Sequence, residues 1–385
     1  MIRYTRRGLL ASAAGLPLLA QASPAQTTPA QAVPAQPQPA WNTVYHFDED
    51  ERQLAFLDLS FYSSRAGMAI AALSDRGNVK PAALRTTDGG ATWTLVPLKP
   101  RATSIQFLDE SNGWLAADNG IYKSTDAGQS WRRVFRNNNL LRVRFATHER
   151  GYAAGDGGTV LETQDGGKTW KPLAATSGLK TPKERTVYDW IELPNSTVGF
   201  ISGNYQPEQR RRRNDLPAWI DPPAAMRRRQ TPSLSLVLQT IDGGKLWKPM
   251  SSSILGRISR LSIGQRGLGL SLVEFEDSFD YPSEVYLLNL TGGKTDRIYR
   301  DAERHITDLL VLPDNTFLLA GYETPGRLRT APIPGKVHIL HGDASGKWTP
   351  TPVDYRATAR NVRLVPSPSG AVFALTDTGM ILRRS

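Results

Sequence analysis

The residues best suited to bind another molecule are two runs of arginine within residues 206–232. This stretch carries seven arginines against three acids, Glu208, Asp215 and Asp221. A guanidinium group presents a planar fork of donors that can pair with two oxygens of a carboxylate or a phosphate at once. The stretch therefore predicts a site for an acidic partner, and the alternative is a solvated charged loop. The arginines are Arg210, Arg211, Arg212, Arg213, Arg227, Arg228 and Arg229.

Single arginines recur where the chain is expected to begin an inner strand of the fold derived below. We assign them to the same basic face as the two runs, because the connections at these points open on one side of that fold. They are Arg101, Arg142, Arg185, Arg257, Arg304 and Arg360. A continuous surface of this kind would suit the carboxylates of a protein client.

Five acids lie close together in a later connection: Glu274, Glu276, Asp277, Asp280 and Glu284. They are expected to pair with the arginine-rich insertion or to be solvated, and a calcium site is a third interpretation. His338 and His341 are three residues apart on an expected strand, so they face opposite sides and make a poor metal pair. We therefore predict neither a metal site nor a cofactor.

The composition excludes several classes of protein. The 385 residues contain no cysteine, which excludes disulfides, thiolate metal sites, iron–sulfur clusters, a cysteine nucleophile and a lipid-modified cysteine. Hydrophobic residues make up 39% and charged residues 22%, values that are compatible with a folded core. The net charge of +11 leaves nucleic-acid binding open on charge alone.

Four segments align without gaps and organise the body of the chain. They share a Thr or Ser, an Asp two residues later, a glycine turn and a Trp, and they include Asp88 and Trp93, Asp126 and Trp131, Asp165 and Trp170, and Asp242 and Trp247. In such a turn the Asp and Thr side chains accept hydrogen bonds from backbone amides, and glycine supplies positive φ. The Trp then packs between sheets. These eight residues are therefore assigned structural roles.

The spacing of the repeats predicts an all-β propeller. Asp88, Asp126 and Asp165 follow one another at 38 and 39 residues, which is the size of a four-stranded blade. Weaker copies extend over residues 186–250, 257–297 and 303–353, and residues 360–385 supply only three strands. The segment Trp41–Phe47 is expected to complete that last blade. The sequence thus predicts seven four-stranded blades, closed by an N-terminal strand, which removes exposed sheet edges.

The N-terminal residues predict export. Residues 1–22 combine Arg6-Arg7, a short apolar stretch and Ala20-Gln21-Ala22, which is typical of a signal peptide of the twin-arginine type; a Sec signal is the alternative. Residues 23–40 are rich in Pro, Ala and Gln and predict a linker, and residues 41–385 form the propeller. The expected location is the periplasm or the thylakoid lumen, with the protein soluble after cleavage. Export argues against nucleic acid as a partner.

The repeat resembles the Asp-box (BNR) pattern, and the repeat unit is similar to that of the photosystem II stability and assembly factor family. The likeness covers residues 41–385 and is sharpest over residues 84–173 and 234–250. It implies an exported, non-enzymatic, monomeric propeller that docks an acidic segment of a client, such as a membrane protein in photosynthesis, through an arginine-rich patch. The insertion at 206–232 departs from the family pattern.

A glycoside hydrolase of the sialidase or xyloglucanase kind is the alternative function, because Asp-box repeats also occur in those enzymes. Such an enzyme requires a pair of carboxyl groups at the floor of the central funnel. Asp189 and Asp308 lie on expected inner strands, but the spacing nominates no pair. We therefore assign no catalytic residue.

Overall fold

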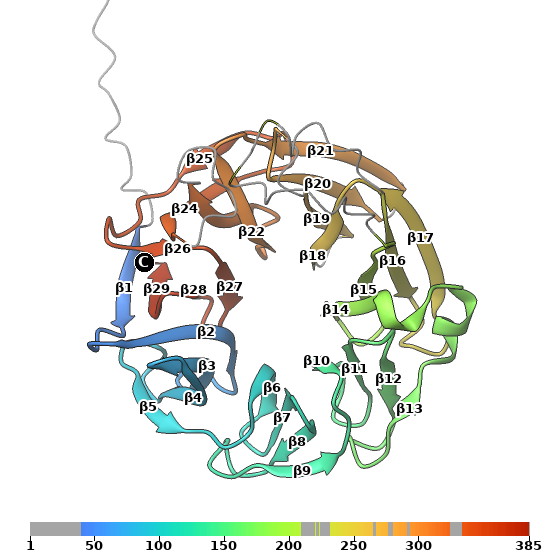
Figure 1. Ribbon diagram of the computed structural model, residues 1–385, viewed down its shortest axis with the longest axis horizontal. Helices are drawn as coiled ribbons and strands as arrows, with labels where there is room; N and C mark the ends of the chain where they lie inside the picture. Colours follow the sequence, from blue (N-terminus) through green and yellow to red (C-terminus); the bar gives the residue numbers. More distant parts are fainter. Residues whose placement is uncertain are drawn as a thin grey trace, which may run out of the picture. The chain divides into compact units, whose positions relative to one another are not determined.

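The computed structural model describes residues 40–208, 220, 223, 232–264, 267–275, 280–290, 293–323 and 333–384. Contacts define a compact unit from Gln38 to Ser385. In this unit the described chain forms seven antiparallel sheets arranged in a ring, with only two short 3-10 helices between them (Figure 1). This confirms the predicted seven-bladed propeller.

Each blade repeats the same order of four strands from the axis outward. The first three blades are β2 (Arg52–Phe61), β3 (Gly67–Asp75), β4 (Asn78–Thr86) and β5 (Thr94–Pro97); β6 (Ala102–Asp109), β7 (Asn112–Ala117), β8 (Gly120–Ser124) and β9 (Arg132–Phe135); and β10 (Leu140–Phe145), β11 (Gly151–Gly155), β12 (Val160–Thr163) and β13 (Lys171–Pro172). The short helices η1 (Ala174–Gly178) and η2 (Lys183–Arg185) lead into the fourth blade.

The later blades follow the same order. They are β14 (Thr186–Glu192), β15 (Gly199–Tyr205), β16 (Ser233–Thr240) and β17 (Lys248–Ile254); β18 (Arg257–Ile263), β19 (Leu268–Glu274), β20 (Ser283–Asn289) and β21 (Lys294–Arg300); β22 (Arg304–Val311), β23 (Phe317–Glu323), β24 (Gly335–Gly342) and β25 (Trp348–Pro350), with β26 (Thr358–Ala359) also on β24; and β27 (Val362–Pro366), β28 (Val372–Thr376) and β29 (Met380–Arg384) with β1 (Trp41–His46).

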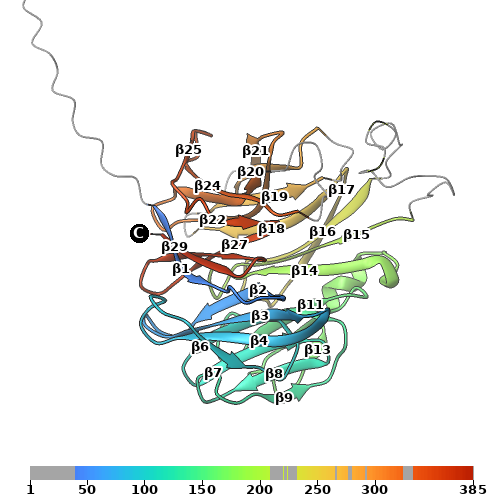
Figure 2. The ribbon, with the colours of Figure 1, turned by 60° about the vertical axis from the view of Figure 1, so that its left-hand side comes forward.

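The ring is closed by pairing the two ends of the folded chain. β1 lies antiparallel to β29, with Trp41 opposite Arg384 and His46 opposite Met380 (Figure 2). The predicted N-terminal closing strand is therefore confirmed. Because the seventh blade takes its fourth strand from the other end of the chain, opening the ring would require breaking a sheet.

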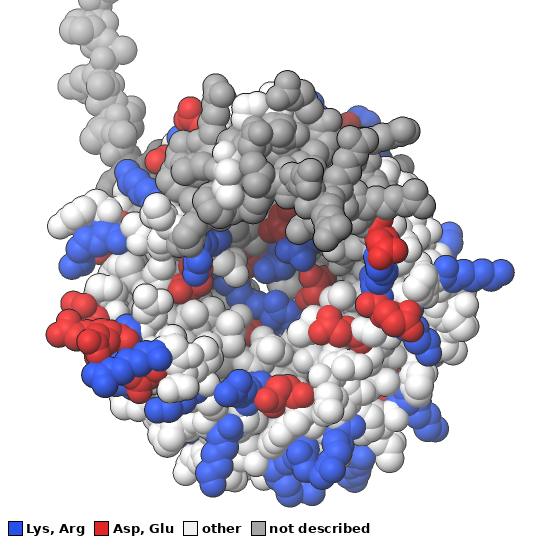
Figure 3. Space-filling view, viewed as in Figure 1, with Lys and Arg blue, Asp and Glu red and all other residues white. Residues whose placement is uncertain are grey.

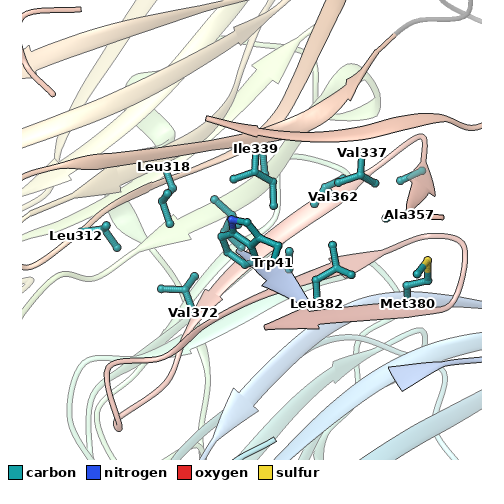
Figure 4. Packing of buried hydrophobic residues seen from close by; sticks show 14 residues of the cluster. Trp41, Leu312, Leu318, Val337, Ile339, Ala357, Val362, Val372, Met380 and Leu382 are labelled. Carbon is teal, nitrogen blue, oxygen red and sulfur yellow. The ribbon is translucent and has the colours of Figure 1, made fainter. Parts of the chain in front are cut away.

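Tryptophans at the start of the outer strands fill the spaces between blades. Trp93 contacts Phe373 of the preceding blade edge-on, and Trp247 contacts Tyr152 in the same way. Trp41 occupies this position in the seventh blade. It is almost fully buried among Leu318, Ile339, Val362 and other apolar side chains (Figure 4), and its indole N–H donates to Thr351 Oγ1 at 3.1 Å.

The four aligned turns have the geometry that their residue types predict. In the first, the Thr86 hydroxyl accepts from the Gly90 amide at 2.9 Å, and Asp88 Oδ1 accepts from the Thr92 amide at 3.0 Å. Gly89 and Gly90 have φ of 75° and 84°, which a side chain would strain. The Thr92 hydroxyl also donates to Asp88, and these hydrogen bonds lower the pKa of that carboxyl to about 2.

We expect Trp41→Ala to lower the free energy of unfolding by about 3–5 kcal/mol, because it leaves a cavity in the junction that closes the ring. Urea denaturation followed by circular dichroism measures the change. Tyr355→Ala is the control, since Tyr355 is 82% exposed and its loss should cost about 0.5 kcal/mol or less. A similar small loss for both variants would contradict a closing role for Trp41.

Candidate functional site

The inner strands share one irregularity that places polar side chains around the axis of the ring. On six of the seven inner strands a one-residue register shift precedes a polar or aromatic residue. A bulge of this kind re-aims the side chain that follows it. The residues after the shift are Asp58, Ser104, Arg142, Trp190, Arg260 and Asp308, and Arg363 holds the matching position in the seventh blade, where the same alternation of apolar residues follows.

These side chains, and the side chains two positions later on the same strands, form hydrogen bonds with the free inner edge of the next blade. Asp58 Oδ2 accepts from the Ile105 amide at 3.0 Å, and Asp308 Oδ2 accepts from the Leu364 amide at 2.8 Å. Ser104, Gln106, Glu192 and Ser262 accept from the inner strand of the next blade in the same way. The N–H groups of an unpaired strand edge are costly to leave without a partner, so these contacts are structural.

Where the residue after the bulge carries a hydrogen-bond donor, it donates to a backbone carbonyl of the next blade instead of accepting from an amide. Arg142 Nε donates to the Asp189 carbonyl at 3.1 Å, and the Trp190 indole N–H donates to the Leu261 carbonyl at 2.9 Å. Arg363 Nη1 donates to the Leu57 carbonyl at 3.1 Å and so joins the last blade to the first. Each of the seven junctions between neighbouring inner strands is thus bridged by at least one side chain.

Asp58 is the ionic centre of this arrangement. Its carboxylate, which is 1% exposed, lies 3.1 Å from Arg144 Nη2, 3.1 Å from Arg363 Nη2 and 3.7 Å from Arg142 Nη1. Burial alone would raise the pKa of Asp58, but these three arginines together hold it well below its usual range. Asp58 is therefore ionised, and it ties the first blade to the third and the seventh.

Trp190 brings three of the arginines together. The guanidinium carbons of Arg142, Arg260 and Arg363, from three different blades, lie 5.2, 4.7 and 5.4 Å from the centre of its ring. A cation over an indole face is attracted by the ring quadrupole, more strongly where water is excluded. Figure 3 shows Lys or Arg and Asp or Glu side chains around the hollow at the centre of the ring.

The remaining carboxyl groups near the axis are buried and less acidic. Burial raises the pKa of Asp308 despite Arg260, and burial raises that of Asp189 despite Arg257. Burial also raises the pKa of Glu192, to about 7, although the Ile263 amide donates to it. Asp189 and Asp308, the two acids that the sequence places on inner strands, thus both lie in this polar layer.

The arginines at the entries of the inner strands are placed on one end of the ring. Because all blades run in the same order, Arg101, Arg185, Arg257, Arg304 and Arg360 each precede or begin an inner strand at the same end, which we call the entry face. Four of them pair with acids: Arg185 with Glu208, Arg257 with Glu274, Arg304 with Asp301 and Arg360 with Asp377. Arg142 lies deeper, beside Trp190.

Several predicted features fall wholly or partly outside the described residues. The runs Arg210–Arg213 and Arg227–Arg229 lie there, as do Glu276 and Asp277 of the acidic group. Glu274 and Glu284 pair with arginines of their own blade, Arg257 and Arg300. In the part of the chain that is described, no His, Asp or Glu residues group in a way that could hold a metal ion. No helix there has the length and hydrophobicity needed to cross a bilayer.

The sequence did not reveal the polar layer around Asp58 and Trp190. Arg144, Arg260 and Arg363 were not singled out, and neither was Glu192. A signal exists, because each inner strand carries a polar residue, or Trp190 in the fourth blade, followed by alternating apolar residues, and aligning the seven strands on that pattern superposes these positions.

Comparison with known proteins identifies the fold. Neither a protein-family model nor a curated protein sequence matches the chain. Among solved structures, the chain resembles a YCF48 bound to D1 peptide, with 16% identity over 90% of this chain and 99% of that chain and a TM-score of 0.57. It also resembles YCF48 from Cyanidioschyzon merolae (16% identity, 90% and 98% covered, TM-score 0.58) and the WD40 beta propeller domain of Doa1 (10%, 90% and 97%, TM-score 0.50).

We expect Asp58→Asn to lower the free energy of unfolding by about 3 kcal/mol, because three buried arginines lose their common counter-charge while the amide keeps an acceptor oxygen. Asp50→Asn, at an exposed position, is the matched control and should change the stability little. Urea denaturation at pH 7 measures both. Equal stability of the two variants would show that Asp58 does not hold the inner strands together.

Glu192→Gln is expected to change how stability depends on pH. The pKa of Glu192 is raised from its usual value to about 7 in the folded chain, so the stabilising contribution of Glu192 falls as pH rises from about 4.5 to 7, by about 3 kcal/mol. Glutamine keeps the acceptor for Ile263 and carries no charge, so this fall should be absent.

Urea midpoints at pH 5, 6, 7 and 8 provide the measurement for Glu192→Gln. The variant should match the wild type near pH 5 and exceed it at pH 8. Glu208→Gln, at an exposed position, should follow the wild-type curve throughout. Parallel curves for the wild type and Glu192→Gln would contradict a raised pKa for Glu192.

Proposed function

We propose that the chain is an exported, non-enzymatic binding propeller of the assembly-factor kind. Its entry face holds an acidic segment of a client protein, and arginines at the starts of the inner strands contact the carboxylates of that segment. Membrane proteins assembled outside the cytoplasm are the class of client that this role fits.

The observation that carries the proposal is the recurrence of one arginine at the same place in five blades. Arg101, Arg185, Arg257, Arg304 and Arg360 come from separate blades and share the entry face. A repeated cation at one end of a ring provides a charged surface that an extended acidic segment can follow.

The acids that pair with these arginines do not close the surface to a client. Arg185 and its partner Glu208 are 41% and 78% exposed, and Arg360 is 51% exposed. Exposed ion pairs are worth about 0–1 kcal/mol, so a carboxylate of the client can replace the internal acid at small cost. The more buried pair between Arg257 and Glu274 is better suited to positioning the face than to exchanging partners.

The structural neighbours add support of a limited kind. One of them is described as YCF48 bound to D1 peptide, which is a propeller of similar fold in complex with a peptide. The identity of 16% shows a shared fold, and we propose that the present chain also binds a peptide segment. The signal-like residues 1–22 support export, and the absence of cysteine is compatible with folding before transport.

The engagement of the axial carboxylates weighs against the glycosidase alternative. A glycosidase needs two carboxyl groups roughly 5–10 Å apart that are free to protonate the leaving group and to attack or activate water. Asp308 accepts from the Leu309 and Leu364 amides through its two oxygens. Asp58 likewise accepts from the Leu59 and Ile105 amides and pairs with three arginines. Both carboxylates are occupied in holding strands.

An acidic peptide distinguishes specific contact from general attraction to a basic protein. The entry variant replaces Arg101, Arg185, Arg304 and Arg360 by Gln. The control variant replaces four exposed cations of the opposite end, Arg65, Lys168, Lys245 and Lys347, by Gln. Fluorescence anisotropy with a labelled glutamate-rich peptide should show binding about tenfold weaker for the entry variant alone, since four exposed contacts sum to about 1.4 kcal/mol.

Equal weakening in the two variants would mean that net charge, rather than the entry face, attracts the peptide, and the proposal would fail. The insertion is tested separately, by changing Arg210–Arg213 and Arg227–Arg229 to Ala and comparing the clients captured from an envelope fraction. If the wild type and this variant capture the same clients, the insertion is excluded from the site. The entry face is then tested by the peptide experiment alone.

A further inference from the structure

The outer strand of the fourth blade combines length with a charge-free stretch. β17 has seven residues, whereas β5 and β9 have four, β25 has three and β13 has two. β1 has six residues and carries no Asp, Glu, Lys or Arg, but Trp41 forms backbone hydrogen bonds with Pro352 and Asp354, so part of its edge is covered. β21 is equally long, but it carries Lys294, Asp296, Arg297 and Arg300. Between Pro249 and Gly256, by contrast, the chain carries no charge.

No described segment pairs with the outer edge of β17 over most of its length. Met250, Ser251, Ser252 and Ser253 are all exposed. Within the described part of the chain, no hydrogen bond joins the backbone of Ser251–Ser253 to anything other than the neighbouring strand β16. The helix η1 packs near this strand, with Gly178 lying against Pro249 at its beginning. β17 forms the outer side of its blade (Figures 1 and 2).

Exposed apolar residues are frequent in the part of the sequence that contains the same strand. Nine large apolar residues of the described chain are classed as exposed, and five of them fall between Ile220 and Leu255: Ile220, Ile241, Leu246, Met250 and Leu255. Leu246 stands where the other three aligned turns have the Thr or Ser that donates to their Asp. The turn that leads into β17 therefore has an exposed leucine where the other turns have a hydrogen-bonding residue.

Natural sheets protect such edges by shortness, charge, proline or a covering segment. Beyond Pro249, β17 shows none of these devices among the residues that the structure describes, and the backbone N–H and C=O groups of its outer edge define what can cover it. We propose that the edge from Met250 to Ile254 receives an extended segment of a partner protein as a fifth strand of the fourth blade. Five paired residues span about 17 Å, and alternate side chains of the segment would meet Met250 and Ile254.

A second copy of this chain is the less favoured occupant. The chain carries a net charge of +11, so two copies repel each other as they approach, whereas a neutral or acidic segment does not experience that repulsion. The chemistry of the segment follows from the edge: it is uncharged where it pairs with the serines, and it carries an apolar residue at each end. This inference does not depend on the entry face, because β17 lies on the rim of the ring.

The probe is a labelled peptide with the sequence of β16, residues 233–240, because these side chains already pair with β17 in the fold. Anisotropy with the full chain should show saturable binding. A peptide N-methylated at alternate residues keeps the side chains but loses the donors along one edge, and it should not bind. Amides of β17 should gain protection from hydrogen exchange, while those of β16 keep their rates, which distinguishes edge addition from strand replacement.

The edge variant Ser251→Lys/Ser253→Lys should weaken binding at least tenfold. Thr94→Lys/Pro97→Lys on β5 adds the same charge to another outer strand and should bind as the wild type does. Equal binding by the N-methylated peptide or by the edge variant would overturn the proposal. So would a dimer in sedimentation velocity that the edge variant loses, since the edge would then belong to a second copy. The entry variant should retain full binding, which separates failure here from failure of the proposed function.

Discussion

The constraint on which this structure depends is that each blade presents one free strand edge to the axis of the ring. Outer edges can be solvated, but seven inner edges crowd together where water is scarce, and their N–H and C=O groups need partners. The chain meets this need with side chains from the preceding blade, such as Asp58 toward Ile105 and Asp308 toward Leu364. The residue that follows each bulge must therefore be able to reach the next blade and to form a hydrogen bond with it. This structural requirement comes before any catalytic or binding role.

The second constraint is the packing between blades, and it is met unevenly. Blade 5 has no tryptophan in its sequence, and its junction with blade 4 has a small apolar core of Phe200, Leu261 and Ile263. The buried hydroxyls of Ser202, Ser235 and Ser259 on the strands of these two blades have no hydrogen-bond partner in the described chain. The long insertion and the two longest outer strands also belong to these blades. These irregular features therefore lie beside the junction that has the smallest apolar core.

The sequence predicted the ring because the features that define it are local. The Asp, Gly and Trp of each turn lie within eight residues, and the three strands after Arg360 left a blade that only Trp41–Phe47 could complete. The axial layer escaped prediction because it is not local: Asp58 meets Arg144 and Arg363, which lie far away in the sequence. Whether an arginine is buried beside Trp190 or exposed at an entry depends on a shift of a few residues, as Arg142 shows, and spacing alone does not resolve that.

The excess of positive charge accordingly divides into two populations with different energetics. Around Asp58 the arginines are mostly buried, and removing one charge leaves the others unpaired, so these residues cannot be exchanged without loss of the fold. At the entry face Arg185 pairs with Glu208, which is 78% exposed, and Arg360 is itself half exposed, so water screens these pairs and they can be broken at little cost. Only the second population can exchange its partners while the ring stays closed. A rigid axis with exchangeable ion pairs at the entry face would allow the proposed client to bind without loosening the ring.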